Sequence, residues 1–389
     1  MTIQKMTSSA VSPKKHETVG SSIVPSRARR HASVVRVLAA TALLASAPGA
    51  HAQADLEPVP VGSIDLYGTD AIDADAFREE FGSQIVRLAA LYEDVRLGRN
   101  ADQAGLDALA DELNGAIETR LSALVPLAHL EFGATTDFGP PPQIHVVVDV
   151  VEEADKARRM PFREAPIGHF EDPGGLFVLW DAFSEKVFTL AYAGAGLQVT
   201  TCPVLHCVAP FDLPELEPYL ERFNAGAREH EELLYTIAEQ SGDASQRANA
   251  LFLLAHTNDA ERLLPALGRS IYDPAGGVRN NAMRVLMFLA KARPELDYPV
   301  EDLIAALDFP ASSDRNKAGY TLAALAAQPR YRAAIRDGAV PTALRMLRML
   351  KPNNHDPAYE ILQLVSGESY GDRDYAAWEA WATANLPQH

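Results

Sequence analysis

The chain has 389 residues, enough for two or three domains, and its 47% hydrophobic content is ample for buried cores. Asp and Glu outnumber Lys and Arg by 52 to 35, which gives a formal net charge of −17. Such an acidic chain lacks the basic surface that binds nucleic acid or anionic membranes. We therefore expect a protein or peptide partner.

The N-terminal segment has the pattern of a secretory signal peptide. Basic residues precede a short apolar run from Val37 to Ala47, and Ala50-His51-Ala52 then provides a small-residue cleavage site. A membrane anchor is the alternative, but this run is too short to span a bilayer. We therefore predict that residues 1–52 are removed after Ala52, by the general or the twin-arginine route. The mature protein would be periplasmic or secreted, with no transmembrane span and a net charge of −23, from 28 basic and 51 acidic residues.

Residues 61–153 predict a small α+β domain with the order β-α-α-β-β. A strand from Ser63 to Tyr67 precedes a helix that Asp73 caps and that runs through Phe81. A helical stripe and a third helix follow, and the strands Leu127–Phe132 and Ile144–Val151 end the segment. The stripe consists of Ile85, Leu88, Tyr92 and Val95, and the third helix carries Leu106, Leu109, Leu113, Ile117 and Leu121.

This segment resembles the POTRA-type domain of exported proteins. The residues that carry the resemblance are the run Ile64-Asp-Leu-Tyr-Gly68, Ile72, Phe77, and the last strand from His145 to Val151 with Glu152-Glu153 after it. The resemblance implies a sheet edge that pairs with strands of client proteins, beginning with Ile144–Val151. Any other small α+β domain remains the alternative.

Residues 154–211 are predicted to connect this domain to the rest of the chain through one helix and a cysteine loop. Asp172-Pro173 provides a helix cap and a first-turn proline. Only two cysteines exist, Cys202 and Cys207, and an even pair in an exported chain usually forms a disulfide. A zinc site that includes His206 is the alternative, although adjacent His206 and Cys207 are poorly spaced for tetrahedral binding.

Residues 212–389 are predicted to be helical repeats, because one frame, Arg-x-x-Ala-x-x-x-Leu, recurs in them. The frame reads Arg247, Ala250, Leu254; Arg279, Ala282, Leu286; Arg315, Ala318, Leu322; and, with His in place of Arg, His355, Ala358, Leu362. The alanines are 32, 36 and 40 residues apart, a period typical of an α-solenoid of stacked helix pairs.

The helices of these repeats follow from the caps and the apolar periodicity. First helices are expected at Asp259–Leu267, Asp297–Leu307 and Val340–Leu350, and second helices begin at Asp273-Pro274 and Asp356-Pro357. Tyr375, Trp378 and Trp381 mark a C-terminal capping helix.

The repeats resemble the HEAT-repeat family over residues 243–365, and back to residue 212 if the helices there stack as well. The segment from Asp273 to Ala282, Asp-Pro-Ala-Gly-Gly-Val-Arg-Asn-Asn-Ala, carries the resemblance. It implies a mainly α fold, a HEAT-like α-solenoid preceded by the small α+β domain. It also implies that Asp273 braces Arg279 and that Asp314 or its neighbour braces Arg315, whereas His355 departs from the pattern.

Motifs for catalysis or metal binding do not stand out. The sequence contains no G-x-S-x-G, H-E-x-x-H, C-x-x-C or P-loop pattern. Glu229-His230-Glu231-Glu232 is the densest cluster of ligand-type side chains, but adjacent residues fan around a helix, so we expect a solvated face there. We therefore predict no catalytic residue, no metal and no cofactor.

The repeat frame predicts a partner-binding stripe. With the frame Ala and Leu turned inward, the residues two positions after and before each Ala point outward. The predicted partner-binding residues on these positions are Phe252, Asn280, Arg284, Asn316 and Tyr320, followed by Glu360. Aromatic rings and Arg are typical of protein interfaces, although Phe252 and Tyr320 could instead pack against a neighbouring loop.

The sequence thus predicts an exported, non-enzymatic scaffold that binds a protein or peptide, with cell-envelope assembly as one setting. Two alternatives stay open. One is a HEAT-type enzyme or cofactor-attachment factor with a site between the domains near Cys202–Phe211. The other is a structural homo-oligomer.

Overall fold

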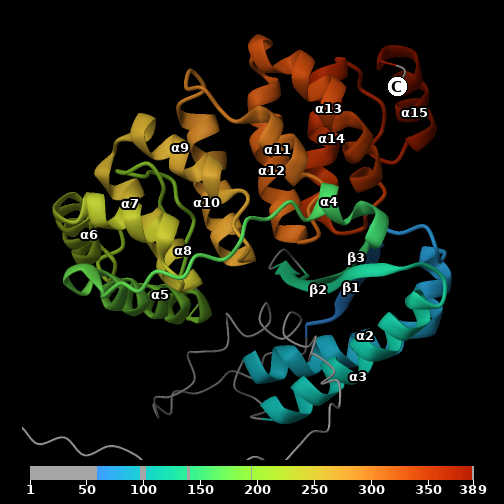
Figure 1. Ribbon diagram of the computed structural model, residues 1–389, viewed down its shortest axis with the longest axis horizontal. Helices are drawn as coiled ribbons and strands as arrows, with labels where there is room; N and C mark the ends of the chain where they lie inside the picture. Colours follow the sequence, from blue (N-terminus) through green and yellow to red (C-terminus); the bar gives the residue numbers. More distant parts are fainter. Residues whose placement is uncertain (1–58, 97–101, 138–140, 194, 388–389) are drawn as a thin grey trace, which may run out of the picture. The chain divides into compact units, whose positions relative to one another are not determined.

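The computed structural model describes residues 59–96, 102–137, 141–193 and 195–387. This part of the chain is mainly helical, with one three-stranded sheet before the helical repeats, as predicted (Figure 1). The predicted leader, residues 1–52, lies outside the described residues. Within the described ranges, no helix combines the length and the apolar character needed to cross a bilayer.

The N-terminal unit has the predicted order β-α-α-β-β. Its elements are β1 (Val61–Tyr67), α2 (Ala74–Arg96), α3 (Gln103–Ser122), β2 (Leu127–Asp137) and β3 (Gln143–Glu152). The helix expected to run through Phe81 and the stripe that begins at Ile85 form one helix, α2. Phe81 and Ile85 are four residues apart on one buried face, and the single Gly82 between them does not end the helix.

Strand β3 lies in the centre of the sheet, parallel to β1 and antiparallel to β2. The expectation that Ile144–Val151 provides a sheet edge is therefore wrong. Val146 and Val148 pack against α2 and α3, whereas Val147 belongs to the core of the helical repeats. Because both faces of β3 are covered, its sequence is almost continuously β-branched instead of alternating with polar residues.

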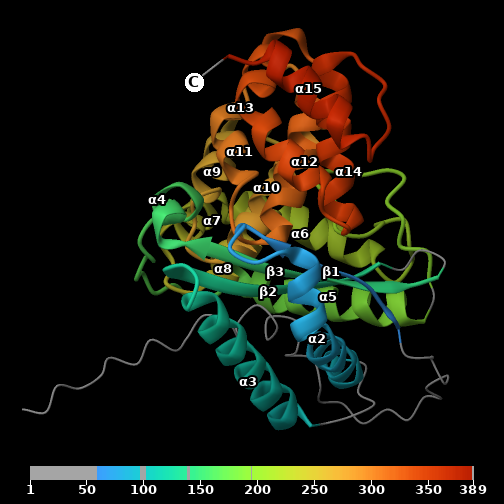
Figure 2. The same ribbon diagram turned by 90° about the vertical axis from the view of Figure 1, so that its right-hand side faces the viewer.

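After β3, a short helical turn leads into α4 (Lys156–Arg159), and a long connection then runs from α4 to α5 (Leu176–Tyr192) (Figure 1 and Figure 2). The helices that follow α5 are α6 (Glu217–Glu229), α7 (Glu231–Gln240), α8 (Ala244–Leu254), α9 (Ala260–Ser270), α10 (Gly276–Ala292), α11 (Val300–Ala306), α12 (Ser312–Ala326), α13 (Pro329–Leu347), α14 (Pro352–Ser366) and α15 (Tyr375–Asn385). The frame lies on the second helices α8, α10, α12 and α14, each of which contacts the next.

Burial confirms the inward side of the frame. All four frame alanines and all four frame leucines are completely inaccessible to solvent. The approach of α12 and α14 is tight at Gly319, where a Cβ atom would lie only 2.9 Å from the Cβ of Pro357. At the C-terminal end, α15 buries Trp378 completely, as the predicted cap requires.

Helix α14 begins at Pro352, earlier than the expected cap at Asp356-Pro357. Pro357 lies inside the helix and has no N–H for the carbonyl of Asn353, one turn before it. The side-chain amide of Asn316, on α12, donates to that carbonyl at 2.6 Å. A side chain of one repeat thus replaces a backbone hydrogen bond that the next repeat lacks.

Buried arginines of the frame link each repeat to the following one. Arg247 donates to both carboxylate oxygens of Asp273, at 2.8 and 2.7 Å. Arg279 donates to the Asp314 carboxylate at 2.7 Å and reaches only the backbone carbonyl of Asp273. Asp273 and Arg279 are thus in contact as expected, but through the backbone carbonyl, because each carboxylate pairs with the arginine of the preceding repeat.

The sheet provides the carboxylate for the next frame arginine, Arg315. Asp314 directly precedes the frame arginine of the third repeat, and Asn354 occupies the same position before His355 in the fourth repeat. The fourth repeat therefore offers Arg315 a neutral amide where the third repeat offers Arg279 a carboxylate. The Arg315 guanidinium pairs instead with Asp149 of β3, which also accepts from Arg159 of α4 at 2.8 Å. Asp149, Arg159 and Arg315 are at most 2% exposed, so a buried ion triad joins the sheet to the repeats.

A second polar contact joins the sheet to the start of α14. Asp65 of β1 accepts from the backbone N–H groups of Leu350 and of Lys351, the N-cap residue of α14, at 2.8 Å each. Lys351 Nζ donates to Thr135 of β2 at 2.8 Å and to Ser312 at 2.9 Å. Burial, with the charge of Arg315, lowers the pKa of Lys351 to about 7.

We expect Ala282→Leu to destabilise the protein by about 1–3 kcal/mol, because the fully buried Ala282 has no room for a larger side chain. Ala292→Leu, at the exposed end of the same helix, is the matched control and should change the free energy of unfolding by less than about 0.5 kcal/mol. Urea denaturation of both variants measures the difference. Equal midpoints would show that Ala282 does not lie at a tight contact.

Asp149→Asn should destabilise the full chain by roughly 3–5 kcal/mol, because it leaves the buried Arg315 without its carboxylate and Arg159 with only the more distant Asp308. Asp111→Asn removes the same charge from the exposed side of α3 and should cost less than about 0.5 kcal/mol. The comparison again uses denaturant unfolding of the full chain. If Asp149→Asn is as stable as the Asp111→Asn control, the triad does not stabilise the contact between the sheet and the repeats.

Candidate functional site

Two parts of the chain cover the second helices. At α8, the ring of Phe252 lies 5.3 Å from Trp180 of α5 and 5.2 Å from His206. At α12 and α14, the sheet contacts Arg315 and Lys351. Between these two covers, α10 and α12 carry Arg284, Lys317 and Tyr320, which stay partly exposed; we call these three residues the uncovered stretch.

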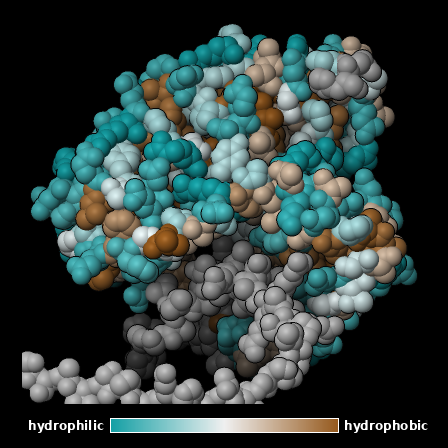
Figure 3. Space-filling view, in the orientation of Figure 1, coloured by the Kyte–Doolittle hydropathy of each residue, from teal (hydrophilic) through white to brown (hydrophobic). Residues whose placement is uncertain are grey.

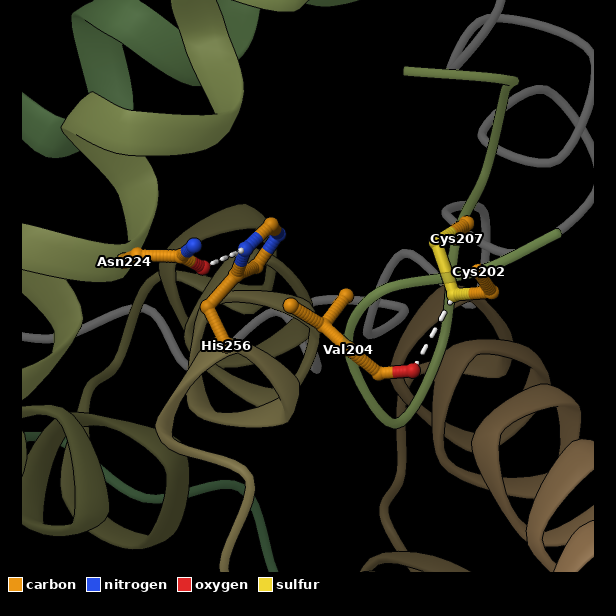
Figure 4. The surroundings of a disulfide bond; sticks show 5 residues. All are labelled: Cys202, Val204, Cys207, Asn224 and His256. Carbon is orange, nitrogen blue, oxygen red and sulfur yellow. Dashed lines mark hydrogen bonds between the residues drawn. A yellow bond between two sulfur atoms is a disulfide. The ribbon is translucent and has the colours of Figure 1, made fainter. Parts of the chain in front are cut away.

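The cysteine loop forms the first cover. Cys202 and Cys207 are joined in a disulfide, as predicted, and no thiolate remains for the alternative zinc site (Figure 4). The Sγ of Cys202 lies 3.1 Å from the carbonyl oxygen of Val204; because a disulfide sulfur carries no hydrogen, this contact is not a hydrogen bond. Leu205 N donates to the carbonyl of Ala255 at 3.2 Å and so attaches the loop to the end of α8.

Two histidines, His206 in this loop and His256 next to it, are buried and neutral. His256 shares a hydrogen bond of 2.9 Å with Asn224 of α6, and burial lowers its pKa to about 4 (Figure 4). The His206 ring lies 4.6 Å from Phe288, and burial, with the charge of Arg284 second, lowers its pKa to about 3. His206 is therefore a packed loop residue whose two ring nitrogens have no hydrogen-bond partner among the described residues.

Two cations of the uncovered stretch lie on helices that contact each other, Arg284 on α10 and Lys317 on α12. Burial lowers the pKa of Arg284, and burial together with the charge of Arg284 lowers the pKa of Lys317 to about 8. Lys317 Nζ donates to the side-chain oxygen of Asn316. The Nε of Arg284 is buried and has no hydrogen-bond partner within the described part of the chain. An Arg and a Lys are thus held half-buried on neighbouring helices, which raises the free energy of both charges.

Tyr320 continues this stretch toward α14. Its ring lies 5.7 Å from the Nζ of Lys291, and burial, with the charges of Asp356 and Glu360, raises the pKa of its hydroxyl. Asp356 and Glu360 are themselves exposed on α14. The uncovered stretch thus has two cations and an aromatic ring, and two exposed carboxylates of α14 lie next to that ring, so this surface carries charges of both signs.

The predicted partner-binding residues do not all belong to one exposed stripe. Arg284, Tyr320 and Asn280 are partly exposed. Phe252 and Asn316, at 7% exposure each, are buried, so the expected outward orientation is wrong for these two. Phe252 is covered by α5 and the cysteine loop, and the side-chain amide of Asn316 donates a hydrogen bond to the carbonyl of Asn353.

Sequence reasoning missed Lys317. This residue precedes the frame alanine, where the two earlier repeats have Asn249 and Asn281. Asn281 uses that position to bond the carbonyl of Ala248 in the neighbouring helix, at 3.2 Å. A lysine in a position otherwise held by asparagine was the available signal.

The acidic cluster at Glu229–Glu232 is part of the surface. Glu231 and Glu232 accept from Arg262 at 2.8 and 2.6 Å. Among the described residues, no set of three His, Cys, Asp or Glu side chains is arranged to hold a metal ion. On the face that Figure 3 shows, hydrophilic residues predominate and hydrophobic ones are scattered, so a polar site is the better candidate there.

Comparisons with known proteins do not identify this chain. No protein-family model matches it, and no curated protein matches it. The assignment of the site therefore rests on the geometry of its residues.

Proposed function

We propose that this chain is an exported, non-enzymatic scaffold that binds a protein or peptide through the uncovered stretch. The observation that carries the proposal is the pair of half-buried cations beside a partly exposed tyrosine, between two covered parts of the same helix face. Arg and Tyr are enriched among the residues that dominate binding energy at protein interfaces. The HEAT-like arrangement supports this function, because stacked helix pairs usually present such a surface to a partner.

Export is the second element of the proposal. The basic leader, the apolar run and the Ala50-His51-Ala52 site support it, and so does the disulfide, because disulfides persist in oxidising compartments. Cell-envelope assembly is the setting that we propose, since the leader would direct the chain there.

The mass of the exported protein tests this second element. After alkylation under denaturing, non-reducing conditions, the intact mass should correspond to a chain that begins at Gln53 and carries no alkyl group on Cys202 or Cys207. The same sample after reduction is the control and should carry two alkyl groups. A chain that retains Met1 and has two free thiols would contradict export.

Site-specific cross-linking tests the binding surface. A photo-reactive amino acid in place of Tyr320 should form an adduct with a partner protein in the exported fraction, because the ring is partly exposed in the uncovered stretch. The same amino acid at Glu261, exposed on the first helix α9, is the matched control and should not form this adduct. With the purified partner, Arg284→Ala should weaken binding by more than about tenfold, since interface anchors of this type commonly cost above ~1.4 kcal/mol.

Three outcomes would contradict the proposal. They are no adduct from position 320, the same adduct from both positions, or wild-type affinity of a folded Arg284→Ala variant. An adduct between two copies of this chain would instead support the structural homo-oligomer. Phe252 is left unchanged in these variants because it is part of the core, and its removal would measure folding instead of binding.

A further inference from the structure

The buried arginines of this chain show what a guanidinium needs in its interior. Arg159, Arg247, Arg279 and Arg315 are each at most 4% exposed, and each pairs with an aspartate. A charge taken out of water is stable only with an opposite charge or several hydrogen bonds. The sequence therefore provides a carboxylate wherever it buries an arginine in this way.

Arg284 differs from these four arginines. It is partly exposed, its buried Nε has no hydrogen-bond partner within the described ranges, and it forms no ion pair with an aspartate or glutamate there. Its charged neighbour is Lys317, whose pKa Arg284 lowers, so two like charges lie where a carboxylate would be expected. His206, with two unused ring nitrogens, adds a neutral imidazole that can donate one N–H.

The groups around Lys317 also favour an anion. Arg284 comes from α10 and Lys351 from the start of α14, and the neutral His206 of the cysteine loop lies near Arg284. The one carboxylate among the groups that shift the Lys317 pKa is Asp314, on its own helix, and Asp314 is already paired with Arg279. The local charge is therefore positive, in a chain whose net charge is −17.

We propose that Arg284 and Lys317 form a receptor for a carboxylate group, which the bound protein segment presents as an acidic side chain or as its free C-terminus. The inference rests on the proposed function and names the chemistry that the same surface recognises. The planar guanidinium can bind a carboxylate through two parallel hydrogen bonds, and the ammonium of Lys317 adds a point charge. Tyr320 offers a stiff aromatic contact for the residue next to that carboxylate.

The acidic remainder of the chain gives this receptor its selectivity. An acidic segment is repelled by most of the surface, so we expect it to be held at the positive patch alone. The carboxylate would also lower the free energy of the two cations, because each gains an opposite charge. Binding should therefore raise the pKa of Lys317, and affinity should fall as the pH rises through about 8, where Lys317 of the free protein loses its charge.

The test follows Lys317 directly by NMR of the full chain with 13Cε-labelled lysine. In chloride, Lys317 should titrate near about 8. Replacing chloride by acetate at constant ionic strength should raise this pKa by at least about half a pH unit. The exposed Lys186 on α5 is the internal control, and its signal should not respond to acetate.

Peptides then distinguish the two sources of the carboxylate. Acetyl-Gly-Gly-Glu-Gly-Gly-amide offers only a side-chain carboxylate, acetyl-pentaglycine only a C-terminal one, and acetyl-pentaglycine amide offers none. We expect the first two to raise the Lys317 pKa and the amide to leave it unchanged. The peptide with the larger effect at equal concentration identifies the group that the site takes.

Arg284→Gln is the decisive variant. Without the neighbouring positive charge, the pKa of Lys317 in chloride should rise. The pKa shift that acetate and the peptides cause should be mostly lost, because the guanidinium that binds the carboxylate through two hydrogen bonds is gone. Lys317→Arg keeps both cations and should preserve peptide binding without its decline around pH 8. If no carboxylate shifts Lys317 beyond the effect of chloride, or if inorganic phosphate does so and acetate does not, the inference is overturned. Specific cross-linking at position 320 would survive either result, so the two proposals fail separately.

Discussion

The ion pair between Arg315 and Asp149 fixes the position of the sheet against the helical repeats. A buried guanidinium needs a carboxylate and further acceptors, and Arg315 finds them in Asp149 and in the carbonyl oxygens of Phe309 and Pro310, at 2.8 and 2.9 Å. The ring of Tyr67 lies 4.1 Å from the same guanidinium. Because Asp149 is on the central strand, its ion pair with Arg315 sets the place of all three strands. The sheet is thus a structural neighbour of the repeats and not an independent module.

Much of the helical part could be predicted because its signals are local. The spacing of Ala282 and Leu286 identifies a buried helix face without reference to any distant residue, and all eight frame positions of this kind are inaccessible. The neighbours of a strand are not local in this sense. The β-branched run from Ile144 to Val151 could have been interpreted as a central strand, since alternation is lost when both faces are covered. The resemblance to an edge-pairing domain led to the opposite expectation.

The site was predictable only in part, because exposure depends on what another segment covers. Arg284 and Tyr320 follow from the frame and are partly exposed. Phe252 has the same frame position, but α5 and the cysteine loop lie over it. The partner of Arg315 was missed for a related reason: it belongs to β3, far away in the sequence, and the frame gives no sign of it. A neutral Asn354 in the place of Asp314 was the one available hint.

The sheet also limits how this protein can change in evolution. Solenoid proteins gain and lose repeats readily, since each repeat contacts only its neighbours. Here the row of second helices is bounded at α8 by α5 and the cysteine loop, and at α12 and α14 by Asp149 and Asp65. A repeat inserted between these bounds would move Arg315 away from Asp149 and leave a buried guanidinium without its carboxylate. Duplication, the easiest route to a longer array, is therefore closed to this sequence unless the sheet contacts change in the same step.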